Sequence, residues 1–106
     1  MPKYLIEASY TREGIEGVMR AGGSSRVEAV KEAAGSVGGD LESFHFAFGD
    51  HDAIVIVEAP DNEAAAAIAL TVNASGGAVA KTTVLLTPEE VDAAVERSVA
   101  YAAPGA

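Results

Sequence analysis

The chain of 106 residues contains no cysteine. This absence excludes disulfide bonds, thiolate nucleophiles and metal sites built on thiolates, and it is compatible with a reducing compartment. Tryptophan is also absent, and three tyrosines and three phenylalanines supply all the aromatic rings, although 49% of the residues are hydrophobic. We therefore expect a thin core built on alanine and valine rather than on large side chains.

Positive charge is scarce as well. Seven Lys and Arg residues stand against sixteen Asp and Glu residues, which gives a formal net charge of −9. Such a chain repels phosphate backbones and anionic lipid head groups, so neither nucleic acid nor a membrane is an expected partner. No apolar run approaches the roughly 18 residues of a membrane span, and the chain opens on a strand pattern instead of a secretory signal. We expect a cytoplasmic protein.

Four strands are predicted from the apolar pattern, over residues 4–10, 41–48, 53–57 and 79–86. The first two alternate so that their two faces carry unlike side chains, as half-buried strands do. The run 53–57 is apolar throughout, which is typical of a central strand covered on both faces. Since the helices of so small a domain can cover only one face, the sequence predicts that a partner covers the other.

Two helices are predicted between the first and second strands. The first begins after Thr11 as N-cap and ends at Gly22-Gly23. The second begins at Ser25, which has the spacing of a capping box with Glu28, and it ends at Gly38-Gly39.

Two more helices follow. Asp61 is the predicted N-cap of an alanine-rich helix over residues 63–70, and Thr87-Pro88-Glu89-Glu90 opens a tail helix. Three valines at four-residue spacing give the tail helix an apolar stripe, interpreted as a docking seam: Val91, Val95 and Val99.

The predicted order is therefore βαββαβ with an added C-terminal helix. This is the ferredoxin-like arrangement, an α+β fold in which a four-stranded antiparallel sheet carries helices on one face. We expect a single domain over residues 1–102 and a frayed tail over residues 103–106.

Short motifs at the ends of these predicted elements form a set: Lys3-Tyr4, Tyr10-Thr11-Arg12-Glu13-Gly14, Arg26, Gly39, the turn from Gly49 to Asp52, Val57-Glu58-Ala59-Pro60-Asp61, and Gly77. With this set the chain resembles the GYD domain family over most of its length. His51 stands where the name-giving element of that family leads one to expect Tyr. The resemblance implies a ferredoxin-like fold and oligomers that pair sheets as dimeric α/β-barrel proteins do. It implies no established activity.

The strand alternation divides the side chains of the sheet into two sets. One set is expected beneath the helices: Tyr4, Ile6, Phe44, Phe46, Phe48, Val84 and Leu86. The opposite set carries Leu5, Ala47 and Leu85 together with six polar residues that we predict to bind a ligand: Glu7, Ser9, Ser43, His45, Lys81 and Thr83. Such a mixture is typical of a pocket for a small apolar or aromatic molecule. Glu7 and Lys81 are expected to form an ion pair across neighbouring strands.

His45 and His51 are the candidate catalytic residues, because an imidazole can act as acid or base near neutral pH. His45, which faces the predicted pocket, is the first choice, and the alternative for it is a hydrogen-bonded interface histidine.

The segment Gly49-Asp50-His51-Asp52 is interpreted as a turn in which Asp52 binds amides and Gly49 has a positive φ. Metal binding there is the alternative, but adjacent residues rarely converge on one ion, and neither metal nor cofactor is predicted.

The loop Gly22-Gly23-Ser24-Ser25 precedes a helix, where an anion can bind. It lacks the spacing of a Walker motif, and we interpret it as a flexible loop that could close over the mouth of a pocket.

Three hypotheses of function remain open. The first is an oligomeric domain that holds a small molecule between the sheet and a partner subunit. The second is a cofactor-independent oxygenase or isomerase that uses His45 or His51. The third is an assembly module with no ligand.

Overall fold

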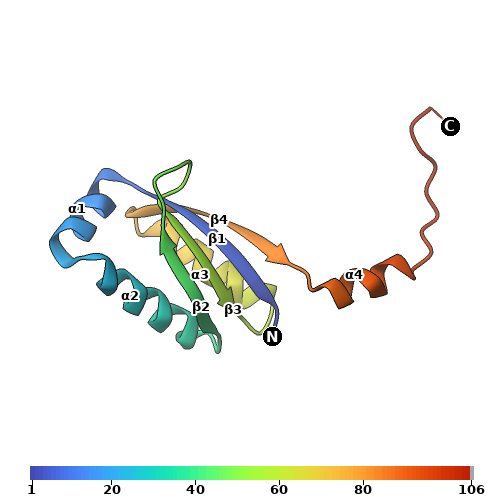
Figure 1. Ribbon diagram of the computed structural model, residues 1–106, viewed down its shortest axis with the longest axis horizontal. Helices are drawn as coiled ribbons and strands as arrows, with labels where there is room; N and C mark the ends of the chain where they lie inside the picture. Colours follow the sequence, from blue (N-terminus) through green and yellow to red (C-terminus); the bar gives the residue numbers. More distant parts are fainter. Residues whose placement is uncertain (106) are drawn as a thin grey trace.

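A computed structural model describes residues 1–105, and eight elements follow one another along the chain (Figure 1). They are β1 (Lys3–Tyr10), α1 (Arg12–Ala21), α2 (Gly23–Ser36), β2 (Asp40–Phe46), β3 (Ala53–Glu58), α3 (Asn62–Ala74), β4 (Ala78–Leu85) and α4 (Pro88–Val95). The predicted frayed tail, 103–106, ends at Ala106, which lies outside the described residues.

The strands form a single sheet in the order β2-β3-β1-β4, and every neighbouring pair is antiparallel. This order and the sequence of helices and strands confirm the predicted ferredoxin-like α+β fold. Helices α2 and α3 run along one side of the sheet (Figure 1).

The core lies between the sheet and these helices. Alternate residues of the two central strands are buried against alanines and one isoleucine of α2 and α3: Tyr4, Ile6, Ala8, Ala53, Val55 and Val57 face Ala34, Ala65 and Ile68. Tyr4 and Val57 are the largest side chains that are fully buried, and the hydroxyl of Tyr4 donates a hydrogen bond of 2.8 Å to Oδ1 of Asn62. The expectation of a thin, alanine-rich core is confirmed.

The predicted faces of the sheet hold, but two strand ends differ from the prediction. β2 stops at Phe46 because residues 47–52 form a loop, closed by a hydrogen bond of 2.8 Å from the Ala47 N–H to the Asp52 carbonyl. Phe48, expected on the core face, is therefore fully exposed. Val84 and Leu86 were also expected beneath the helices, but both are exposed, and Leu86 lies beyond the end of β4.

Side chains cap three helices as the sequence predicts. Thr11 accepts a hydrogen bond from the Gly14 N–H, Asp61 accepts one from the Ala64 N–H, and Thr87 forms a capping box with Glu90. The fourth prediction, a capping box that begins at Ser25, is wrong. Gly22 has a φ of 85°, which turns the chain so that α2 already begins at Gly23, and the Ser25 hydroxyl donates to the Gly22 carbonyl from inside the first turn.

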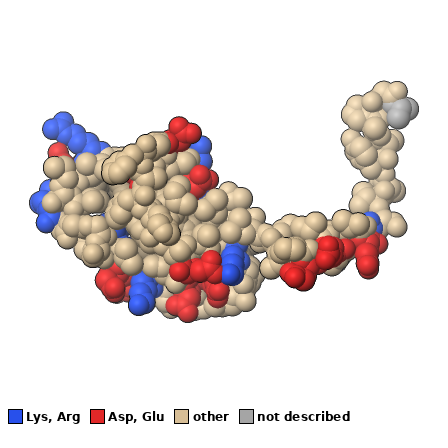
Figure 2. Space-filling model, in the orientation of Figure 1, with Lys and Arg blue, Asp and Glu red and all other residues tan. Residues whose placement is uncertain are grey.

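The tail helix α4 projects away from the sheet and its helices (Figure 1). None of its residues is buried, and its acidic side chains line one side of it (Figure 2). Because the helix ends at Val95, Val99 is not part of it, and all three valines of the predicted seam are exposed. The predicted seam is therefore not buried against the rest of residues 1–105.

Two glycines stand where the backbone of another segment passes very close. A Cβ atom on Gly14 would lie 1.9 Å from the carbonyl oxygen of Gly77, and one on Gly39 would lie 2.2 Å from that of Glu58. Real Cβ atoms do not approach an oxygen so closely, so a side chain at either place forces two segments apart. Close packing thus accounts for both glycines.

We predict opposite effects for the same substitution at two positions of α1. Gly14→Ala should lower the free energy of unfolding by about 1–3 kcal/mol, because the added methyl group overlaps the Gly77 carbonyl. Gly17→Ala is the matched control: its Cβ would have no neighbour nearer than 4.0 Å, the Nη2 atom of Arg20. It should raise stability by about 0.5–1 kcal/mol, since alanine is a better helix former. Urea denaturation followed by circular dichroism measures both, and equal effects at the two sites would contradict the packing argument.

Candidate functional site

The face of the sheet opposite the helices carries the predicted ligand-binding residues. Strand register places His45, Ile54, Glu7 and Lys81 in one row across the four strands. Paired residues of antiparallel strands point to the same side, so the four share a face. The next row holds Ser43, Ile56, Leu5 and Thr83, and Ser9 pairs with Val79 beyond the first. We call these ten residues the open sheet face, and it includes all six polar residues that the alternation predicts to bind a ligand.

The loop between β2 and β3 adds a further residue to this face. His51 lies with Nδ1 at 3.4 Å from Oγ of Ser9 and with Nε2 at 3.6 Å from Oε2 of Glu7. The side chain of His51 is 22% exposed and that of Glu7 is 31% exposed. The three side chains form a carboxylate–imidazole–hydroxyl cluster, in which the imidazole is able to pass a proton between its neighbours or bind a hydroxyl or carbonyl group.

Asp52 holds this loop against β1. Its Oδ2 atom accepts a hydrogen bond of 2.8 Å from the Tyr10 N–H, and its own N–H donates one of 2.9 Å to the Ala8 carbonyl. The predicted amide-binding role of Asp52 is confirmed. These bonds fix the backbone next to His51, so they also determine where the imidazole lies.

The positive φ predicted for Gly49 is wrong. Positive φ angles occur at Gly22, Gly38, Gly76 and Gly105 within residues 1–105, and not at Gly49. A Cβ atom there would also meet nothing within 4 Å. The loop over residues 47–52 turns without a left-handed residue, and Asp52 anchors it to β1.

The two histidines differ in their surroundings. His45 is exposed on β2, an edge strand, whereas His51 contacts two polar side chains. Geometry therefore favours His51 over His45, the reverse of the order that the sequence suggested. His51 is 42 positions from Ser9 and 44 positions from Glu7 in the sequence, so local spacing could not predict these contacts. The sequence indicated only, through the alternation of the strand, that Glu7 and Ser9 share a face.

The expected ion pair between Glu7 and Lys81 does not form, although strand register places the two residues directly opposite one another. Within residues 1–105, Lys3 forms an ion pair with Glu42 and Arg12 forms one with Glu16, while Glu7 lies beside the imidazole of His51. Glu7 is directed to the imidazole instead of to Lys81. At the other end of the face, the hydrogen bond and the charge of Glu42 raise the pKa of Lys3 above its ordinary value.

Residues 1–105 contain neither a candidate metal site nor a membrane-spanning helix. No group of three or more His, Asp or Glu side chains is placed to hold a metal ion. No helix in this part of the chain is long and apolar enough to cross a membrane.

The family model of the GYD domain matches residues 4–95. The chain belongs to the GYD domain family. No curated protein and no solved structure matches it. The matched segment of this GYD domain runs from β1 to the end of α4, so it includes Glu7, Ser9 and His51 as well as the projecting helix.

We predict that Asp52 stabilises the fold and Asp50 does not. Asp52→Ala removes an ionised acceptor from the Tyr10 N–H, which should lower the free energy of unfolding by about 1.5–3 kcal/mol. Asp50→Ala is the control two residues away: Asp50 is exposed, and its loss should change stability by less than about 0.5 kcal/mol. Chemical denaturation at neutral pH compares the two, and a loss for Asp50→Ala as large as for Asp52→Ala would show that the anchor is not Asp52.

Proposed function

We propose that this GYD domain forms a homo-oligomer through the open sheet face and holds a small, partly apolar molecule between that face and a partner subunit. One observation carries the proposal: the aliphatic side chains at the centre of the face lie beside the polar cluster of Glu7, Ser9 and His51. The centre supplies area for an apolar body, and the cluster supplies groups that orient it.

The apolar part of the face supports association. Leu5, Ile54 and Ile56 are only partly buried by their own chain, and Val79 is 60% exposed. Contiguous apolar surface of this kind on a sheet usually marks an interface or a ligand site. The other side of β3 is already buried against the helices, so a second copy is what would complete its burial.

The polar cluster lies at one end of this apolar surface and sets the chemistry of the ligand. Glu7 offers acceptor oxygens, Ser9 a hydroxyl, and His51 a donor and an acceptor in its neutral form. A hydroxylated aromatic or aliphatic molecule satisfies these groups while its body covers Ile54. Lys81, opposite Glu7, adds a cation at the margin of the same row.

We predict that a charge at the centre of the face breaks the oligomer. Wild-type protein at micromolar concentration should sediment as a dimer or larger species. Ile56→Glu should weaken association by about tenfold or more, because a carboxylate buried in an apolar interface is costly. Leu70→Glu is the control, since Leu70 is exposed on α3, and it should leave the assembly unchanged. Circular dichroism checks that both variants fold, and a monomeric wild-type protein would overturn the proposal.

A second function is favoured by the same cluster: a cofactor-independent oxygenase or isomerase in which His51 moves a proton. With hydroxylated polycyclic aromatics as substrates, His51→Ala should lower kcat by about 100-fold or more, the usual effect of losing a general acid or base. His45→Ala should leave the rate nearly unchanged, because His45 lies exposed on the edge strand. Oxygen uptake and product analysis measure the rates. Equal rates in wild type and both variants would exclude proton transfer by either histidine. The small-molecule-binding function would then be the one that remains.

A further inference from the structure

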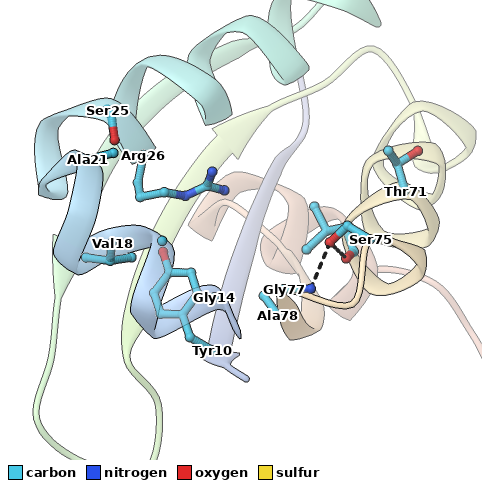
Figure 3. A pocket seen from close by; sticks show the side chains of 12 residues that line it. Tyr10, Gly14, Val18, Ala21, Ser25, Arg26, Thr71, Ser75, Gly77 and Ala78 are labelled. Carbon is cyan, nitrogen blue, oxygen red and sulfur yellow. Dashed lines mark hydrogen bonds between the residues drawn. The ribbon is translucent and has the colours of Figure 1, made fainter. Parts of the chain in front are cut away.

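A hollow on the helical side of the sheet is independent of the open sheet face. It has a volume of about 380 Å³ and lies between α1, the start of α2, the end of α3 and the adjoining ends of β1 and β4. Its walls include residues from each of these segments: Tyr10, Val18, Ser25, Arg26, Thr71 and Ala78 (Figure 3). We call it the Arg26 pocket.

Arg26 is the only charged residue among those that line this pocket. Its Nε atom is buried and has no hydrogen-bond partner within residues 1–105, and none of the ion pairs in that part of the chain includes Arg26. The residue as a whole is only partly buried, but a buried N–H that lacks an acceptor carries a free-energy cost. A bound anion would supply the missing partner. In Figure 3 the guanidinium extends from α2 toward the middle of the pocket.

A smaller cavity of about 90 Å³ continues from this pocket beneath α2 and α3. The two hollows share Tyr10, Arg26, Val72 and Ala78. Arg26 is the only charged residue in the wall of the inner cavity, which is otherwise mainly aliphatic and aromatic, with Ala29, Ala33, Phe44 and Ile68 among its members. Arg26 thus lies where an outer pocket with several polar residues meets an inner cavity that is almost wholly apolar.

We infer that the Arg26 pocket binds an amphipathic carboxylate, whose head group pairs with Arg26 and whose apolar tail enters the cavity between the helices and the sheet. The planar fork of a guanidinium matches the two oxygens of a carboxylate. Tyr10, which belongs to the wall of both hollows, carries a hydroxyl that offers a second donor.

The hydrogen bonds of the wall favour a carboxylate over a phosphate. The hydroxyls of Ser25, Thr71 and Ser75 already donate to the carbonyls of Gly22, Ala67 and Val72. The Gly77 N–H donates to the Ser75 hydroxyl. Few donors therefore remain for a third oxygen or a second negative charge, and the net charge of −9 disfavours a dianion further.

Calorimetric titration of the full chain with sodium octanoate tests the inference. Octanoate should bind, and both acetate, which lacks the tail, and octan-1-ol, which lacks the charge, should bind about tenfold more weakly or worse. Arg26→Gln should weaken octanoate binding by about tenfold or more. It should not lower the melting temperature of the free protein, because the buried Nε–H that it removes has no hydrogen-bond partner within residues 1–105. Lys31→Gln removes the same charge from an exposed position of α2 outside the pocket and should change affinity by less than about twofold.

Ala29→Leu tests the tail separately, because it fills part of the inner cavity and leaves Arg26 in place. It should weaken octanoate binding while the melting temperature shows that the protein still folds. Absence of octanoate binding to wild type, or equal affinity in the Arg26→Gln variant, would overturn the inference. Binding of octan-1-ol as tight as that of octanoate would also overturn it, because the charge would then contribute nothing. Binding of inorganic phosphate as tight as that of octanoate would overturn it too, because the site would then be an anion site that does not recognise an apolar tail. The open sheet face is untouched by these variants, so their outcome is independent of the proposed oligomer.

Discussion

The register of β1 between β3 and β4 is the constraint on which both faces of this protein depend. Even-numbered residues of β1, from Tyr4 to Tyr10, point to the helices, and odd-numbered ones, from Leu5 to Ser9, point to the open sheet face. A slip of one residue would exchange the two sets and place Glu7 in the core. Hydrogen bonds at the end of the strand resist such a slip. Asp52 binds the backbone of Ala8 and Tyr10, and the Thr11 N–H donates a bond of 3.0 Å to the Gly77 carbonyl.

Much of this architecture was predictable because it follows from local rules. Alternation identified the strands and sorted their faces, and Thr11, Asp61 and Thr87 marked three helix starts correctly. The error at Ser25 is instructive, since the motif had the right spacing but a preceding glycine with positive φ began the helix sooner. Gly22 precedes Ser25 in the chain, and its backbone conformation determined where α2 begins.

The functional geometry was predictable only in part, because it depends on contacts between distant residues. Alternation placed Glu7 and Ser9 on one face, but the return of His51 to them depends on how Asp52 anchors the loop to β1. Arg26 was visible as a motif residue, but the flexible loop predicted before it is wrong, because Gly23, Ser24 and Ser25 already belong to the first turn of α2. The Arg26 pocket has no acidic residue in its wall, and this could not be predicted, because the wall forms only when α1, α2 and α3 pack together. Likewise, Gly14 and Gly39 stand out in the sequence, whereas the carbonyl groups that exclude a side chain there belong to segments far along the chain.

Tyr10 connects the two candidate sites, which lie on opposite faces of the sheet. Its ring lines both hollows beside Arg26, and its backbone N–H is bound by the carboxylate of Asp52, next to His51. The wall of the Arg26 pocket and the loop that positions the imidazole are therefore parts of one hydrogen-bonded unit. A ligand that moves the Tyr10 ring alone leaves this unit intact, because rotation about the side chain does not disturb the N–H. Only a displacement of the β1 backbone would reach His51, and the pairing of β1 with strands on both sides opposes it. The geometry thus favours two sites that act independently, with the rigid sheet between them.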